Sequence, residues 1–267
     1  MRHEQARISH GKSAARRGLG LLAVVALMAA GCGEVDLEVS RKFQEAQRTF
    51  DQATSEEDFA KAAAMYQDIL DSNGPCGAVL YNQGNAFMQA GQPGRAIAAY
   101  RQAQRLKPRD PYLEANLAYA MGTADANGGR RPLIRHILFW QDWLSYPAKF
   151  HLAAALCLLT FAGGVAVLFV ESRLLRRVTI GALVVSGLMI VSAGYDWYRF
   201  EGAEHGIVVQ HEVTARKGNA QSYEPAFTEP IGEGTEFEVI DRRGDWMLIR
   251  LAGNQEGWIE DDAAVVY

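Results

Sequence analysis

Cysteine and histidine are the side chains of this chain that could act as a nucleophile and its base, but their spacing does not favour that chemistry. Cys76 has no neighbouring histidine in the sequence to activate it. His205 and His211 flank the start of a predicted strand, and one such pair is more typical of a surface than of a zinc site. A glycine-rich phosphate-binding loop is also missing from the sequence. We therefore expect no enzyme, no catalytic residue, no metal and no cofactor.

A period of 34 residues is the strongest internal pattern. A shift of 34 aligns Ala62 with Ala96 and Tyr66 with Tyr100, and in both pairs the alanine stands four residues before the tyrosine. That spacing places each pair on one helical face. The period predicts helix-turn-helix repeats, and we place the array at residues 40–122, with a last helix that covers its open end.

The second copy, residues 77–110, resembles the tetratricopeptide repeat family. Its small, aromatic and proline positions hold Gly84, Phe87, Ala96, Tyr100, Ala103 and Pro108. The small residues let the two helices of a repeat approach closely, and the aromatic residues fill the space between repeats. The resemblance implies an all-α array that binds other proteins. The first copy is degenerate, because Phe50 stands where a small residue belongs.

Asparagines are the polar residues that such an array could offer to a bound peptide. In related repeats that clamp a terminal carboxylate, asparagines stand on successive first helices, at positions that match Asn85 and Asn116. The position that usually holds lysine in those repeats is Tyr81 here, so the cation for a carboxylate is missing. The resemblance makes Tyr81, Asn85 and Asn116 candidate groove residues. The alternative is that the asparagines have no such role.

The N-terminus has the pattern of an export signal. Five basic residues precede a short apolar run that ends at Ala30, and the run is too short to span a bilayer comfortably. We expect a signal peptide over residues 1–31. The small residues before Cys32 resemble a lipobox, which would make Cys32 a lipidation site; the alternative is an ordinary signal in which Cys32 is incidental.

Two long uncharged runs predict a transmembrane hairpin. Residues 152–170 and 178–195 carry no charge, and at 1.5 Å per residue each run spans roughly 27–29 Å, close to the hydrocarbon thickness. Buried core helices are the alternative, but runs that are apolar all round leave no face for water. The connecting loop, residues 171–177, is basic and is therefore expected on the cytoplasmic side, through Arg173, Arg176 and Arg177.

This orientation places both soluble parts outside the cytoplasmic membrane. Basic residues between positions 130 and 149 favour the opposite orientation. The segment 132–150 is amphipathic and rich in tryptophan, which predicts a helix at the headgroup layer, or alternatively one that packs on the repeats. Small residues in both spans predict close packing of the two helices: Gly163, Gly164, Gly181 and Gly187.

The C-terminal segment, residues 204–267, has short alternating runs that predict several strands in a small all-β barrel. The run from Gly234 to Trp246, followed by Gly257, Trp258 and Ile259, resembles the bacterial SH3 (SH3b) family. That resemblance implies peptide binding on an aromatic surface, with Tyr223, Phe227 and Trp246 as candidates and Trp258 in the core. Thirteen carboxylates against five basic side chains disfavour nucleic acid and anionic lipid.

The order of signal, repeats, two spans and SH3b domain resembles the BatE family of the Bat aerotolerance operon. That resemblance implies an envelope complex with von Willebrand A domain proteins and MoxR-type ATPases as partners. The leading interpretation is a membrane-anchored, non-catalytic scaffold in such a complex. The alternative is a cell-wall anchor that binds peptidoglycan peptide through the SH3b domain, and a wall hydrolase is disfavoured by the residues discussed first.

Overall fold

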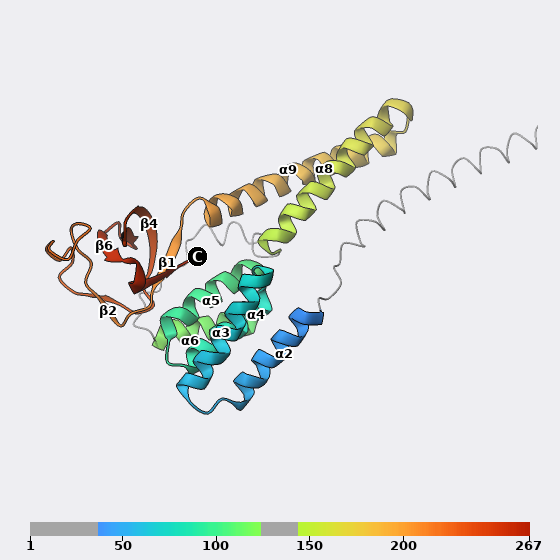
Figure 1. The fold of residues 1–267 in the computed structure, drawn as a ribbon. Coiled ribbons are helices and arrows are strands. Elements are labelled where there is room, and N and C mark those ends of the chain that lie inside the picture. The colour runs from blue at the N-terminus through green and yellow to red at the C-terminus, as the bar shows by residue number, and fades with distance from the viewer. Residues whose placement is uncertain (1–36, 124–143) are drawn as a thin grey trace, which may run out of the picture. The chain divides into compact units, whose positions relative to one another are not determined.

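A computed structural model describes residues 37–123 and 144–267 of the chain. Residues 45–267 form one compact unit by their contacts, and this unit contains a helical array, a helical hairpin and a C-terminal β domain (Figure 1). The predicted signal peptide of residues 1–31 and the lipidation candidate Cys32 lie outside the described residues. Most of the predicted interfacial segment 132–150 also lies outside the described residues. Its last residues belong to a hairpin helix that begins at Tyr146.

The helical array confirms the prediction of helix-turn-helix repeats. Its helices are α2 (Leu37–Gln52), α3 (Glu56–Asn73), α4 (Gly77–Gln89), α5 (Pro93–Leu106) and α6 (Pro111–Thr123). Helix α3 begins in a capping box, in which the Ser55 hydroxyl accepts from the backbone N–H of Asp58 and the Asp58 carboxylate accepts from the N–H of Ser55. Gly91 turns the chain between α4 and α5 with a φ of 69°, a left-handed conformation that glycine adopts at little cost.

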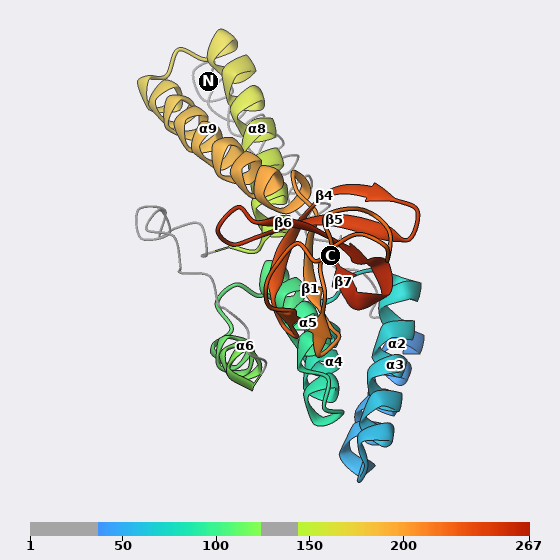
Figure 2. The same ribbon diagram turned by 90° about the vertical axis from the view of Figure 1, so that its left-hand side faces the viewer.

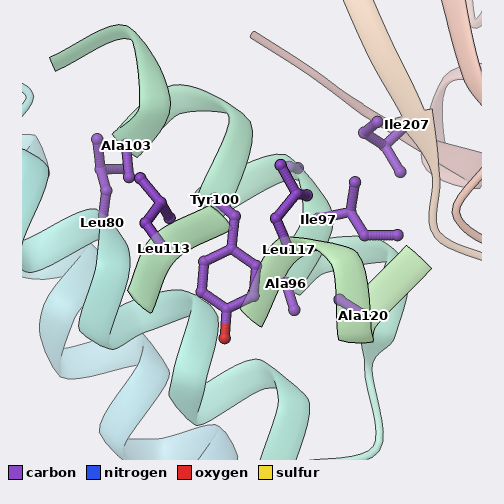
Figure 3. Packing of buried hydrophobic residues seen from close by; sticks show 10 residues of the cluster. Leu80, Ala96, Ile97, Tyr100, Ala103, Leu113, Leu117, Ala120 and Ile207 are labelled. Carbon is purple, nitrogen blue, oxygen red and sulfur yellow. The ribbon is translucent and has the colours of Figure 1, made fainter. Parts of the chain in front are cut away.

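Tyr100 lies in the middle of the array core and is 1% exposed (Figure 3). Alanines and leucines of α4, α5 and α6 surround it in one buried cluster that includes Leu80, Ala96, Ala103, Leu113 and Leu117. A Cβ added at Gly84 would collide with the Tyr100 ring, so the predicted need for a small residue here has a direct physical cause. Phe87 is half-buried and packs against the same cluster.

The hairpin consists of α8 (Tyr146–Phe169) and α9 (Arg173–Glu201), which pack against each other (Figure 2). Both helices are long and apolar enough to cross a membrane. Protein covers only 6% of the apolar stretch of α8 and 17% of that of α9. Large apolar side chains such as Phe161 and Leu168 are therefore exposed. A core helix of a soluble protein would have them covered, so the pair favours association with a membrane.

Two details of the hairpin differ from the prediction. Helix α9 begins at Arg173, so the three arginines stand in its first turns and the connection is shorter than residues 171–177. Arginine is a good helix former, and the Ser172 hydroxyl caps the helix by accepting from the N–H of Leu175 at 3.3 Å. A Cβ at Gly163 would lie 2.7 Å from Thr179 Oγ1, but a Cβ at the other three glycines would meet nothing within 4 Å. Close packing is therefore confirmed at Gly163 and wrong at Gly164, Gly181 and Gly187.

The β domain contains a five-stranded sheet of order β6-β5-β4-β1-β7 and a two-stranded sheet of β2 and β3. The strands are β1 (His205–Val208), β2 (Glu212–Val213), β3 (Ile231–Gly232), β4 (Glu236–Arg243), β5 (Trp246–Leu251), β6 (Glu256–Glu260) and β7 (Ala264–Val266). All strand pairs are antiparallel. The prediction of a small all-β domain is confirmed, whereas the pairing within residues 204–267 does not by itself show a closed barrel.

Alternate side chains of the strands point into one apolar core, which contains Val208, Phe237, Met247, Ile249 and Ile259. The turn between β4 and β5 has Gly244 at a φ of 59°, as a tight hairpin requires. Trp258 is 7% exposed and lies under the guanidinium of Arg243, whose central carbon is 5.2 Å from the ring centre. The prediction that Trp258 is a core residue is confirmed.

Candidate functional site

The predicted groove residues come together on neighbouring helices of the array. Tyr81 and Asn85 are one helical turn apart on α4, so they share a face of that helix. Asn116 lies on α6 and Tyr100 on α5. These four residues are hereafter called the Asn–Tyr cluster. The resemblance to carboxylate-clamping repeats made Tyr81, Asn85 and Asn116 candidates, and Tyr100 joins them because its hydroxyl donates to Asn85 Oδ1.

Three hydrogen bonds connect the Asn–Tyr cluster. Asn116 Nδ2 donates to Asn85 Oδ1 at 2.8 Å and to the Tyr81 hydroxyl at 3.1 Å. The Tyr100 hydroxyl donates to the same Asn85 oxygen at 2.8 Å. The cluster therefore bridges three helices, and each of its side chains is held in one orientation.

The cluster leaves one donor group and one acceptor group unused. Within the described residues, Asn85 Nδ2 and Asn116 Oδ1 take part in none of these hydrogen bonds. An amide nitrogen has two N–H donors and an amide oxygen has two lone pairs. Turning both amides over would keep the Asn85–Asn116 bond and again leave one donor and one acceptor. The backbone of one residue in an extended chain offers the complementary pair, a C=O and an N–H that face the same side.

Burial keeps the Tyr100 hydroxyl protonated. Loss of solvation raises the pKa of Tyr100 well above its ordinary value of 10.0, and the nearby Tyr81 raises it further, while the neighbouring amide of Asn116 acts in the opposite direction. The hydroxyl thus stays a donor across the physiological pH range. It donates to Asn85 Oδ1 and so orients the Asn85 amide.

Two exposed tyrosines flank Asn116 on α6. Tyr112 is 75% exposed and Tyr119 is 67% exposed, four residues before and three residues after Asn116. This spacing places all three along one stripe of the helix, and Leu113, Leu117 and Ala120 form the buried stripe beside it. The sequence analysis missed both tyrosines, although the alternation of tyrosine with a buried leucine stripe was a signal that could have found them.

The surroundings of the cluster do not suit a terminal carboxylate. In residues 37–123 and 144–267, no hydrogen bond or ion pair joins a lysine or arginine to Tyr81, Asn85, Tyr100 or Asn116. Arg101, the next residue on α5 after Tyr100, is instead paired with Glu236 at 2.6 Å. The arrangement therefore suits a neutral polar group better than an anion.

The aromatic candidates of the β domain lie in three different settings. Tyr223 is 49% exposed and lies over Gly218, where an added Cβ would touch its ring. Phe227 is half-buried and packs on the β core beside Gly257. Trp246 is half-buried at the start of β5, opposite Arg243 and Glu260. No ring contact joins these three side chains in the described part of the β domain. Of the three, Tyr223 is the one that is clearly exposed.

Among the described residues, no hydrogen bond joins a cysteine to a histidine. Cys76 precedes α4 and is exposed, while Cys157 lies within α8, 3.2 Å from the Ser186 hydroxyl. His205 begins β1, opposite Glu238 of β4. Across the described residues, no group of three or more His, Cys, Asp or Glu is arranged to hold a metal ion.

A comparison with known protein families finds a match in the helical array. Residues 55–111 match the family model described as tetratricopeptide repeat, a span that runs from the cap of α3 to the start of α6. It includes Tyr81, Asn85 and Tyr100 of the cluster and ends before Asn116. A search of curated proteins found no match to the chain. The tetratricopeptide repeat is a non-catalytic fold for protein–protein interaction, and that is the family to which residues 55–111 of this chain are similar.

Proposed function

We propose that this protein is a membrane-anchored, non-catalytic adaptor that binds an extended segment of a partner protein at the Asn–Tyr cluster. The observation that carries the proposal is the unused donor and acceptor of Asn85 and Asn116, held in place on a tetratricopeptide array. The N–H and C=O of one residue in an extended segment point to the same side and would satisfy both. The exposed rings of Tyr112 and Tyr119 would cover the partner on either side.

The hairpin supports the anchoring part of the proposal. Helices α8 and α9 expose apolar side chains along their length, as lipid contact requires. Their connection is followed directly by Arg173, Arg176 and Arg177, which would keep it in the cytoplasm. Both soluble domains would then lie on the outer side of the cytoplasmic membrane, in agreement with the predicted export signal.

The resemblance to the BatE family supports the choice of partner. It points to a cell-envelope complex with a von Willebrand A domain protein and a MoxR-type ATPase. A neutral groove fits an internal extended segment of such a partner, because a chain terminus would bring a charge that the cluster does not neutralise. The outward-facing array would meet the von Willebrand A domain protein on the outer side of the membrane.

The β domain gives a second candidate function. Its antiparallel strands and its Gly257-Trp258-Ile259 ending are consistent with the SH3b resemblance, which includes closure into a barrel. The specific observation is the exposed ring of Tyr223, on which a cell-wall peptide could pack. Sedimentation of the full chain with sacculi tests this function, since loss of co-sedimentation in Tyr223→Ala would support it and unchanged co-sedimentation would remove it.

Asn85→Asp is the sharpest test of the adaptor function. Aspartate keeps the oxygen that accepts from Tyr100 and Asn116, but it replaces the free N–H donors by a second acceptor. The full chain in nanodiscs should bind a purified von Willebrand A domain protein, and Asn85→Asp should weaken that binding about tenfold or more, as expected for loss of a buried hydrogen bond.

The matched control for this test is Asn82→Ala, which changes an asparagine of the same helix outside the Asn–Tyr cluster. The adaptor proposal expects binding by Asn82→Ala to equal that of the unchanged chain. Equal binding by Asn85→Asp and the unchanged chain would show that the cluster does not contact the partner.

A further inference from the structure

Helix α5 takes its N-terminal cap from the β domain. Its own N-cap residue, Gln92, makes no side-chain capping bond, and Pro93 has no N–H to offer. The first free N–H belongs to Gly94, and it donates to Glu233 Oε1 at 2.8 Å. A carboxylate at this end of a helix is favoured by the helix dipole as well as by the hydrogen bond.

Gly94 is glycine because the β-domain backbone lies directly against it. A Cβ at this position would come within 2.6 Å of the Val208 carbonyl oxygen and 3.0 Å of Val209 Cα. These are backbone atoms of β1 and of the residue after it, so they cannot rotate away as a side chain would. The contact is therefore specific for glycine at this point of the helix.

The same face of α5 continues this contact along its length. Ile97 is fully buried and shares one cluster with Ile207 of β1 (Figure 3). One turn further, Arg101 Nε lies 2.6 Å from Glu236 Oε1. After another turn, Arg105 donates to the Tyr267 carbonyl at 3.3 Å and lies 5.0 Å from the centre of the Tyr267 ring. A cap, an apolar contact and two polar contacts thus follow one another on a single stripe.

Tyr100 connects this stripe to the candidate site. It stands between Ile97 and Arg101 on α5, and its hydroxyl holds Asn85 in the Asn–Tyr cluster. Any displacement of α5 would therefore move the group that orients Asn85.

We propose that the β domain is a structural clamp on α5: it caps this helix and fixes its position against the β domain. The clamp thereby holds the array and the β domain as one body and keeps Tyr100 in place to orient Asn85. The surface that contacts α5 is formed by the chain's own β1, together with the carboxylates of Glu233 and Glu236. The clamp needs no bound partner, so it can be tested independently of the adaptor function.

Hydrogen exchange on the full chain in nanodiscs tests the clamp. Gly94→Ala should push the β domain away and speed amide exchange in the first turn of α5 by about two- to thirty-fold, the range expected for loss of an N-cap. Gly122→Ala is the matched control, because Gly122 is also helical but an added Cβ there meets nothing within 4 Å. It should leave α5 exchange unchanged.

Exchanging the charges of residues 101 and 236 gives a second, independent test of the clamp. Arg101→Glu alone places two carboxylates together and should speed exchange in α5 and in β1, whereas Arg101→Glu with Glu236→Arg should restore slow exchange. The clamp is supported if Gly94→Ala and Arg101→Glu both speed exchange and the double change restores it. It is overturned if α5 exchange is the same in Gly94→Ala, Gly122→Ala and the unchanged chain, or if the double change fails to restore it.

Discussion

Lys149 of α8 and Asp196 of α9 form an ion pair at 2.5 Å, with only 2% and 7% of their side chains exposed. The pair lies at the end of the hairpin where the chain enters α8 and leaves α9 toward β1. Two charges removed from water in this way are costly, and each compensates the other. The pair therefore fixes the register of the two helices at the point where both soluble domains join the hairpin.

Lys149→Met should destabilise the hairpin by about 3–5 kcal/mol, because it takes the compensating charge away from buried Asp196. Lys149→Met combined with Asp196→Leu should recover most of that loss, since no buried charge is left. Thermal unfolding of the full chain in detergent measures both. If the single and the double variant are equally destabilised, the ion pair is not what fixes the register.

The contact of Gly163 with Thr179 predicts different effects at two adjacent glycines of α8. Gly163→Leu should separate α8 from α9, because even a Cβ at this position comes within 2.7 Å of Thr179 Oγ1. Gly164→Leu should be tolerated, since nothing lies within 4 Å of a Cβ there. Cysteine crosslinking between the two helices in membranes reads their separation, and similar crosslinking yields for both variants would contradict the observed packing.

Gly84→Ala should destabilise the array by about 1–3 kcal/mol, because the added methyl group overlaps the Tyr100 ring in a packed core. Gly122→Ala makes the same change on α6 in open space and should instead stabilise its helix slightly. Chemical denaturation of the full chain, followed by the circular dichroism of its helices, compares the two. A Gly84→Ala variant as stable as Gly122→Ala would show that Tyr100 does not pack against α4.

The capping box of α3 predicts a loss of stability in acid. The Ser55 hydroxyl, followed by the backbone N–H groups of Thr54 and Ser55, lowers the pKa of Asp58 below its ordinary value of 3.8. A lowered folded-state pKa gives stability that is present above pH 3.8 and is lost as the pH falls through the folded value. Asp58→Asn should remove this part of the acid sensitivity, and a pH titration of α3 amide exchange would reveal it. An unchanged titration would exclude the cap as its source.

The local elements of this fold could be predicted because their causes are local. The repeat period located Ala96 and Tyr100, and the uncharged runs located α8 and α9. Helical periodicity and span length depend on residues that are close together in the sequence. The helix boundary at Arg173 was missed because the basic cluster was assigned to a loop. In the structure the Ser172 hydroxyl caps the helix, so the helix already begins at Arg173.

The long-range contacts could not be predicted, because nothing in the local sequence specifies them. The bond from Gly94 to Glu233 joins residues 139 positions apart, and the Lys149–Asp196 pair joins residues 47 apart. Of the candidate site, Asn85 and Asn116 followed from repeat positions. The role of Tyr100 as their anchor required the three-dimensional packing, since the sequence marks Tyr100 only as a core residue.

The most direct test of the adaptor function is photocrosslinking in native membranes from position 119, where the exposed Tyr119 adjoins Asn116 on α6. A photoreactive residue there should form one main adduct with a von Willebrand A domain protein, identified by mass spectrometry. The adduct should persist in Asn82→Ala and disappear in Asn85→Asp. An adduct of undiminished yield in Asn85→Asp, or none with any protein, would contradict the account.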